Sequence, residues 1–246
     1  DGNPLIGVVG TRKASAYGLT TAKRMGYQIG KCGGIVVSGM AFGIDGVAMS
    51  GALTGNGTVV GVLGCGVDIV YPACNRALFT DTQRYGCLIS EFAPGTKPYA
   101  WNFPKRNRII SGISHGVLVV EAPEKSGALI TARQALDQGR DVFVVPGNID
   151  VATCVGSNAL LREGATAVSH GWDILSEYTQ VYGDALRQRN IPEPAFDAEK
   201  PAPKVAQRPI LPGKKQEEKK KPIDNGVNVA YSDKNDKLSG LSDGER

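Results

Sequence analysis

The chain has 246 residues, of which 28 are basic and 24 acidic, and its formal net charge at pH 7 is +4. This length allows one sizeable α/β domain with an appendage. No apolar run is long enough to span a membrane and no signal-peptide pattern is visible, so no membrane partner is expected. The mild positive charge does not identify a partner, because the distribution of cations matters more than their sum.

Cysteine usage favours a reduced, cytoplasmic protein. The cysteines are odd in number and no two have C-x-x-C spacing, so a disulfide framework is not expected. With only two histidines in the chain, a zinc site is not expected either, and no motif indicates a cofactor. The cysteines are Cys32, Cys65, Cys74, Cys87 and Cys154.

Apolar runs and helical stretches alternate along the first part of the chain. The runs are continuous, so they predict strands that are buried on both faces, as in a parallel sheet covered by helices. The repeated units predict an α/β class fold with a doubly wound, mostly parallel, Rossmann-like sheet, whose ligands bind beyond the carboxyl ends of the strands. The predicted strands are residues 5–9, 34–39, 58–64, 87–91, 116–121 and 141–147. The predicted helices are residues 16–32, 41–53, 75–85, 107–114, 126–136 (with Ser126 as N-cap) and, in two pieces, 158–178.

The first predicted strand runs into a helix through a turn that contains Gly10, Thr11, Arg12 and Ser15. Backbone N–H groups at the start of a helix, together with the helix dipole, favour anions such as phosphate. Arg12 adds a planar set of donors that matches phosphate oxygens. The turn therefore predicts phosphate binding, and the alternative is an ordinary turn whose arginine points into water.

A second basic segment, residues 103–112, has three cations within four residues and begins with Phe103. Cations can bind phosphates while aromatic rings stack on unpaired bases, and this combination suits single-stranded nucleic acid. The alternative is a surface loop with a phenylalanine anchored in the core. The three cations and the two aromatic residues just before the segment are Lys105, Arg106, Arg108, Tyr99 and Trp101.

Motifs for nucleotides and for catalysis are weak. No P-loop sequence is present, and residues 64–69 carry only the first two glycines of a dinucleotide-binding motif. No nucleophile–base pair stands out, because neither histidine has a triad context. Asp45 and Glu121 are the carboxylates nearest to predicted strand ends, and Asp45 is interpreted as structural, orienting either Arg12 or a backbone turn.

The composition changes after about Gly183, so residues 1–183 are predicted to form the core. Residues 184–225 are rich in proline and lysine and poor in apolar residues, which is typical of a linker or disordered chain. Residues 226–246 are interpreted as disordered or as the shortened start of a further C-terminal domain.

Five motifs occur in a fixed order within about residues 4–178. They are Gly10-Thr11-Arg12-x-x-Ser15, Ser38-Gly39-Met40-Ala41-x-Gly43-Ile44-Asp45, Tyr71-Pro72, Phe103-Pro104-x-Arg106-Asn107-Arg108-Ile109-Ile110-Ser111-Gly112 and Glu121-Ala122-x-x-x-Ser126-Gly127-Ala128-Leu129-Ile130-Thr131-Ala132. Together they resemble the DNA-processing protein A family, known as DprA or Smf. The resemblance covers the whole predicted α/β domain.

The resemblance implies a non-enzymatic protein that binds single-stranded DNA, protects incoming strands in natural transformation and helps to load the RecA recombinase. It also implies an extended Rossmann core that commonly forms a homodimer. By position, it assigns DNA or phosphate contacts to the first turn, to a second strand-end loop and to the basic segment. The residues so assigned are Gly10, Thr11, Arg12, Ser15, Ser38, Gly39, Lys105, Arg106 and Arg108.

The sequence departs from the family pattern near the expected pocket. Relatives often have a basic residue just after the Tyr-Pro pair, where this chain has Ala73, and Arg76 is the candidate substitute. Relatives also tend to have Arg at the position of Phe42 and His at that of Met49. These changes lower the positive charge expected near the pocket, so they predict weaker binding of DNA.

Two alternatives from the same Rossmann-like superfamily stay open. Phosphoribohydrolases of nucleoside monophosphates, which resemble the "lonely guy" enzymes, carry P-G-G-x-G-T-x-x-E. The matching residues 124–131 lack the paired glycines, and Arg133-Gln134 follow in place of the glutamate. The second alternative is a sensor for a small nucleotide that uses the same phosphate turn without chemistry.

Overall fold

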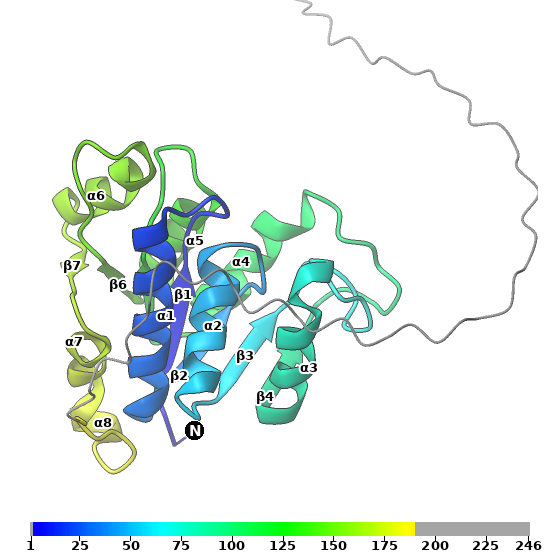
Figure 1. Ribbon diagram of the computed structural model, residues 1–246, viewed down its shortest axis with the longest axis horizontal. Coiled ribbons are helices and arrows are strands. Elements are labelled where there is room, and N and C mark those ends of the chain that lie inside the picture. Colours follow the sequence, from blue (N-terminus) through cyan, green and yellow to red (C-terminus); the bar gives the residue numbers. More distant parts are fainter. Residues whose placement is uncertain (1, 190–246) are drawn as a thin grey trace, which may run out of the picture. The chain divides into compact units, whose positions relative to one another are not determined.

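A computed structural model describes residues 2–189 and shows within them a sheet of seven parallel strands (Figure 1). The strands are β1 (Leu5–Val9), β2 (Ile35–Ser38), β3 (Val59–Val62), β4 (Gly86–Ile89), β5 (Gly116–Val119), β6 (Asp141–Val144) and β7 (Thr166–Ala167). Their order is β4-β3-β2-β1-β5-β6-β7, and each neighbouring pair is parallel. The predicted α/β fold with a doubly wound sheet is confirmed.

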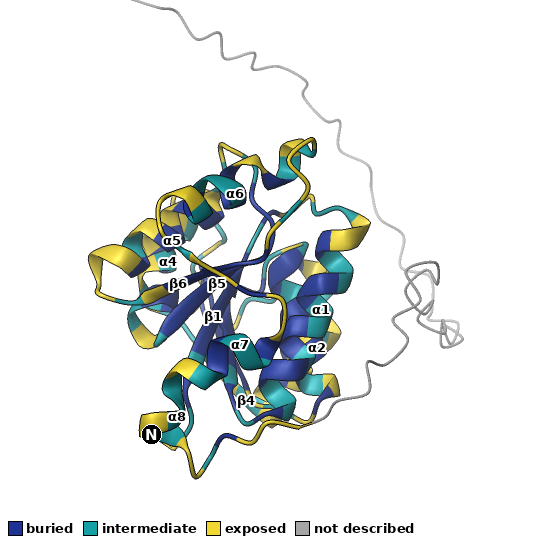
Figure 2. Ribbon diagram, turned by 90° about the vertical axis from the view of Figure 1, so that its left-hand side faces the viewer, coloured by how far each residue is buried: buried dark blue, intermediate teal, exposed yellow. Residues whose placement is uncertain are grey.

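Helices cover both faces of the sheet (Figure 2). They are α1 (Ala16–Lys31), α2 (Ile44–Thr54), α3 (Arg76–Tyr85), α4 (Asn102–Ile113), α5 (Gly127–Asp137), α6 (Val155–Arg162), α7 (Gly171–Leu175) and α8 (Thr179–Tyr182), with 3₁₀ turns at 73–75, 152–154 and 176–178. One apolar core packs the sheet against α1, α2 and α7, and the other packs it against α4, α5 and α6. The strands are therefore buried on both faces, which explains their continuous apolar runs.

The chain reverses its course across the sheet at β1. From β1 it adds β2, β3 and β4 in turn, through α1, α2 and α3, and α4 then leads back to β5 on the other side of β1. Loops that follow β1 and β5 therefore lead to helices on opposite faces. Such a point opens a crevice beyond the carboxyl ends of the two strands, where doubly wound folds bind their ligands.

Two elements differ from the sequence-based expectation. The basic segment lies on a helix that begins at Asn102 rather than at residue 107, because Pro104 falls in the first helical turn, where a proline is tolerated. Between the two helical pieces expected in residues 158–178, the structure places β7. A strand of only two residues has no periodic signal that a sequence could reveal.

The folded core extends a few residues beyond the expected boundary at about residue 183. Leu186 is buried and belongs to the same apolar core as Ile29 and Leu175. The Arg187 N–H also donates a hydrogen bond to the Cys32 carbonyl at 3.1 Å. The rest of the predicted linker, from residue 190, and the predicted segment 226–246 lie outside the described residues. Within residues 2–189, no helix combines the length and apolar character needed to cross a bilayer.

We expect Leu186→Ala to lower the free energy of unfolding by about 2 kcal/mol, because the change removes apolar surface from the core and leaves a cavity. Urea unfolding of the full chain, followed by circular dichroism, would measure the difference. Arg189→Ala, at an exposed position nearby, is the control and should change the stability little. Equal stability of the Leu186→Ala variant and the unchanged chain would mean that residues after 183 do not support the core.

Candidate nucleic-acid interface

A cavity of about 460 Å³ lies at the crevice beyond β1 and β5, and we call it the switch-point cavity. Its walls come from the turn after β1, from the segment that leads into α4, and from the start of α5. The volume falls in the usual range for small-ligand sites. The lining residues are Val9, Gly10, Thr11, Arg12, Ala41, Asp45, Tyr71, Pro98, Ala100, Phe103, Pro104, Arg106, Asn107, Ile110, Pro123, Lys125, Ser126, Gly127, Ala128 and Thr131.

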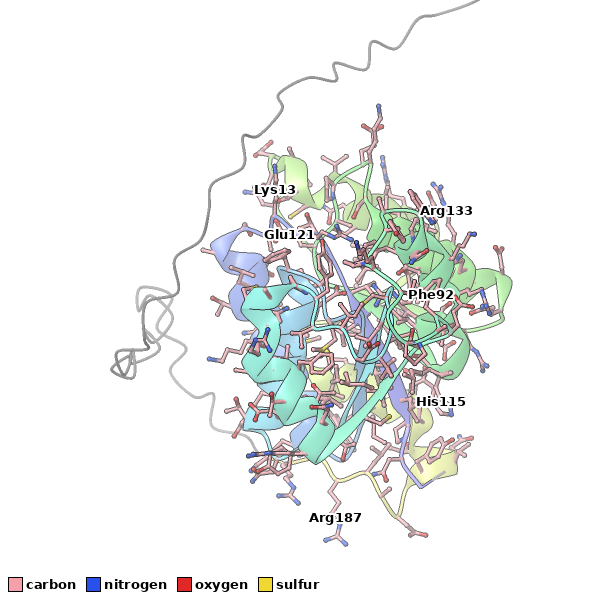
Figure 3. The ribbon with its side chains drawn as sticks, turned by 90° about the vertical axis from the view of Figure 1, so that its right-hand side faces the viewer. Lys13, Phe92, His115, Glu121, Arg133 and Arg187 are labelled. Carbon is pink, nitrogen blue, oxygen red and sulfur yellow. The ribbon has the colours of Figure 1, made fainter. Side chains whose placement is uncertain are left out.

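The turn after β1 is filled by the protein's own carboxylate. Glu121, just after β5, is 1% exposed. Its two carboxylate oxygens accept hydrogen bonds from the Ser15 N–H at 3.1 and 3.3 Å, and one of them also accepts from the Ser15 hydroxyl at 3.0 Å. The Thr11 N–H donates to the Glu121 carbonyl at 2.7 Å, and the Lys13 N–H donates to the Thr11 hydroxyl at 3.2 Å. Figure 3 shows Lys13 and Glu121 at the same end of the molecule.

Gly18 makes room for this arrangement. The Ser15 hydroxyl caps α1 by accepting a hydrogen bond from the Gly18 N–H at 3.0 Å. A Cβ atom on Gly18 would lie 1.7 Å from a carboxylate oxygen of Glu121, so a larger residue would expel the carboxylate. The sequence predicts that this turn presents free backbone N–H groups. This expectation is wrong for residues 11, 13 and 15, whose N–H groups already donate hydrogen bonds within the protein. Ser15 does not line the cavity; its hydroxyl caps α1 and donates to Glu121, and its contact with DNA stays a prediction.

Arg12 is the side chain of this turn that faces the cavity. It is exposed, and its guanidinium carbon lies 5.0 Å from the centroid of the Phe103 ring, within the range of a cation–π contact. Phe103 is half-buried, and its ring centroid lies 5.6 Å from that of Tyr71. Gly10 and Thr11 also line the cavity. Phosphate binding by Arg12 stays a prediction, and this position allows it.

Arg106 is a buried residue of the cavity wall. It is 2% exposed; Nη1 donates to the Gly39 carbonyl at 2.8 Å and to the Val62 carbonyl, and Nε donates to the Asn107 side chain at 3.2 Å. Burial lowers the pKa of its guanidinium to about 10, and the charge of Asp45 opposes this change. Nη1 ties α4 to the ends of β2 and β3, and Nε is bonded within α4, so neither nitrogen is available to a phosphate. A contact between Nη2 and DNA stays a prediction.

Asp45 balances the charge of Arg106 inside the wall. Burial raises the pKa of the Asp45 carboxyl, and the nearby Arg106 charge acts in the opposite direction. The carboxylate accepts a hydrogen bond from the Gly39 N–H at 3.2 Å, so the interpretation that Asp45 orients a backbone turn is confirmed. A Cβ atom on Gly39 would lie 2.5 Å from Arg106 Nη2 and 2.6 Å from Asp45 Oδ2. A side chain at Gly39 would therefore displace one of these two charged groups; Gly39 itself is buried, and its contact with DNA stays a prediction.

The structure separates the remaining predicted site residues from the cavity. Ser38 is buried, and its hydroxyl donates to the Val8 carbonyl at 2.6 Å, so it joins β2 to β1, and its contact with DNA stays a prediction. Arg108 forms an ion pair with Glu91 on the surface. Arg76 and Lys105 are exposed at the start of α3 and on α4, and neither lines the cavity. Contacts of these three cations with DNA stay predictions.

The start of α5 is a part of the site that the sequence analysis missed. Lys125, Ser126 and Gly127 all line the cavity, and Lys125 is exposed. Ser126 is the N-cap, as predicted, and its hydroxyl accepts a hydrogen bond from the Ala128 N–H at 3.2 Å. The signal was present in the sequence, since a lysine directly before a capped helix and after a buried strand lies at the ligand-binding edge of a parallel sheet.

The three departures from the family pattern lie outside the cavity lining. Met49 is fully buried in the apolar core below α2, so the expectation that it lowers the charge near the pocket is wrong. Phe42 and Ala73 are exposed. Among residues 2–189, no three His, Cys, Asp or Glu side chains gather in a way that could hold a metal ion.

Comparison with known proteins fits this fold and these motifs. Residues 1–179 match the family model described as DNA recombination-mediator protein A. The chain belongs to this family. DNA processing protein DprA of Bacillus subtilis (strain 168) is a relative that is 44% identical over 186 residues, which make up 76% of this chain and 60% of the relative. The chain thus spans less than two thirds of the length of that member of the DNA recombination-mediator protein A family.

Two solved structures of family members resemble the described core. The X-ray structure of DprA from Streptococcus pneumoniae has a TM-score of 0.66 and 38% sequence identity, and the match covers 71% of this chain and 62% of that one. The structure of DNA processing protein A from Helicobacter pylori has a TM-score of 0.67 and 26% identity, and the match covers 74% and 83% of the two chains. The Helicobacter pylori structure is described as giving insight into a unique single-stranded DNA binding mode of that protein.

Proposed function

We propose that this chain binds single-stranded DNA at the switch-point cavity. In this proposal it takes part in DNA processing as a binding protein and not as an enzyme. The observation that carries the proposal is the position of Arg12, 5.0 Å from the Phe103 ring centroid at the cavity. A guanidinium can bind a backbone phosphate while an adjacent ring stacks on a base. The binding mode reported for the Helicobacter pylori relative supports the same kind of ligand.

The charges of the lining favour an anionic ligand. Its charged side chains are Arg12, Arg106, Lys125 and Asp45. Arg106 and Asp45 oppose each other inside the wall, so Arg12 and Lys125 supply the net positive charge. These two exposed cations stand on separate elements, the turn after β1 and the loop before α5. Cations on two separate elements suit the successive phosphates of a strand better than they suit one compact anion.

The finer parts of the proposal rest on the family. We infer that the full protein protects incoming strands, helps to load RecA, and forms a homodimer through its Rossmann-like core. All five cysteines are free thiols, which fits a reducing compartment such as the cytoplasm. Strand-exchange assays with RecA, with and without the chain, test the loading role, and sedimentation tests the dimer. No stimulation of strand exchange would overturn the loading role. A monomer at all protein concentrations would overturn the homodimer.

The two nucleotide-based alternatives have less support from the site. Asp45 is the carboxylate of the cavity lining, and it already accepts the Gly39 N–H and faces a buried arginine. A phosphoribohydrolase would need a carboxylate that is free to act on the sugar. Incubation with nucleoside monophosphates would reveal any released base, and competition between mononucleotides and oligonucleotides would reveal a nucleotide sensor.

We expect the chain to bind single-stranded DNA more tightly than duplex DNA, with little dependence on sequence. Within residues 2–189, the candidate site combines cations with an aromatic ring, which suits phosphates and unpaired bases. Titration of labelled oligonucleotides at several salt concentrations would measure both affinities. For single strands, the slope of log K against log salt should be about −0.7 per phosphate contacted. Equal or tighter binding of duplex DNA would contradict the proposal.

A further inference from the structure

Tyr99 and Trp101 form an exposed aromatic pair outside the switch-point cavity. Their ring centroids are 4.8 Å apart, and the ring planes are within 4° of parallel. Tyr99 is 44% exposed and Trp101 is 63% exposed. Both lie on the connection between β4 and α4, which runs along the right-hand edge of the molecule in Figure 1. We call this pair the aromatic plate.

The backbone below the aromatic plate is fixed by the cavity wall. Pro98 and Ala100, which alternate with the two aromatic residues, line the cavity. The buried amide of Asn102 donates to the Gly64 carbonyl at 3.0 Å, and the Asn102 N–H donates to the Tyr99 carbonyl at 3.0 Å. The plate is therefore held in place before any ligand arrives. A ligand that binds to it does not have to order this segment, which lowers the entropic cost of binding.

Two lysines flank the aromatic plate. Lys97 precedes Tyr99 by two residues and is exposed. Lys105 follows Trp101 by four residues on α4, and Trp101 already has helical backbone angles (φ −72°, ψ −13°), so the two side chains lie on one side of the helix. Lys105 is also exposed. The segment thus presents exposed rings between exposed cations, next to the cavity.

We propose that the aromatic plate is a second stacking site for a base of the bound single strand. The inference rests on the proposed function, since the strand would leave the cavity past Ala100 and cross the plate. An unpaired base is the occupant that these observations favour, because the plate adjoins the cavity and because Lys97 and Lys105 can bind the flanking phosphates. This assignment gives Lys105, which the cavity leaves out, a role in the same interface.

Tryptophan fluorescence tests the proposal directly. The chain has two tryptophans. Trp172 lies on α7, half-buried against the apolar core that packs on α1 and α2, so Trp172→Phe leaves Trp101 as the reporter. We expect oligo(dT) to quench the emission of this variant, and the quench should saturate with the affinity that a labelled oligonucleotide reports. The control carries Trp101→Phe and retains Trp172. Its emission should stay nearly constant.

Affinity measurements complete the test. Trp101→Ala should weaken the binding of single strands about fivefold or more, since a base stacked on an aromatic side chain contributes about 1–3 kcal/mol. Trp101→Phe should keep most of the affinity. On a strand of abasic residues the effect of Trp101→Ala should vanish, because no base is left to stack. Thermal melts check that each variant is folded, as the exposure of Trp101 leads us to expect.

The outcomes separate the two proposals. If the unchanged chain binds no single-stranded DNA, both proposals fail. If it binds, but Trp101 is not quenched and Trp101→Ala keeps full affinity, the aromatic plate is outside the interface and only the present inference fails. An equal loss on normal and abasic strands would also overturn stacking as its role.

Discussion

Replacing Arg106 with methionine is expected to lower the free energy of unfolding by about 3–5 kcal/mol. The change removes hydrogen bonds to the Gly39 and Val62 carbonyls, and it leaves the Asp45 carboxyl buried without its opposing charge. Urea unfolding followed by circular dichroism would measure the loss. Arg108→Met, at an exposed ion pair nearby, is the matched control and should change stability by less than about 1 kcal/mol. Similar small losses in both variants would contradict the buried role of Arg106.

The loss caused by Arg106→Met should grow as the pH rises. Burial raises the pKa of the Asp45 carboxyl above 3.8, and the Arg106 charge opposes this rise. A carboxyl of this kind contributes stability that is present below its unfolded pKa and is lost as the pH rises through its folded pKa. Without Arg106 the folded pKa rises further, so the difference from the unchanged chain should be larger near about pH 7 than near about pH 4. Adding Asp45→Asn should recover part of the stability at the higher pH.

Arg12→Ala is expected to weaken the binding of single-stranded DNA about tenfold or more without lowering the melting temperature. A charge-assisted hydrogen bond typically contributes about 1.5–3 kcal/mol, and about 1.4 kcal/mol corresponds to one decade of affinity. Stability should be kept because the side chain is exposed and faces the cavity. Fluorescence anisotropy with a labelled oligonucleotide, together with thermal melts, would measure both quantities.

Two further variants sharpen the Arg12 experiment. Arg12→Lys should recover only part of the affinity, because an ammonium group cannot reproduce the planar fork of donors or its contact with the Phe103 ring. Arg84→Ala removes an exposed arginine from the last turn of α3, away from the cavity lining, and should leave affinity unchanged. Full affinity in a folded Arg12→Ala variant would remove this turn from the interface. A parallel loss of stability would mean that Arg12 supports the fold instead.

The sequence predicts the sheet well because each strand carries its own signal. Continuous apolar runs mark β1, β2, β3, β5 and β6 to within a few residues, and Ser126 marks the start of α5 through a local capping preference. The position of the cavity also follows from the sequence, since parallel strands place their ligands at the carboxyl edge. These features depend on neighbours in the chain, which a single sequence displays.

The roles of single polar residues at this edge could not be predicted in the same way. Arg106 looks like a phosphate ligand in its motif, but its carbonyl partners are 67 and 44 residues away, at Gly39 and Val62. Ser38 looks like a strand-end ligand, but a neighbouring strand accepts its hydroxyl. A buried polar group that bonds to a distant carbonyl and an exposed polar group that is free to bind a ligand have the same local sequence. The sequence alone therefore does not distinguish them. Glu121 is a further example, because the Ser15 N–H that its carboxylate accepts lies 106 residues away in the sequence.

Glu121 places a carboxylate of the protein itself at the head of α1. In folds of this kind that helix end is the natural seat for a lone phosphate group. Here its positive potential is already neutralised from within, so inorganic phosphate or a free nucleotide gains little by entering the turn. For the proposed single-stranded DNA ligand, we therefore expect affinity to accumulate from separate contacts spread over a surface. If the proposed function holds, we expect such a surface to discriminate by the length of the polyanion, so that abundant small metabolites with the same phosphate chemistry compete poorly for it.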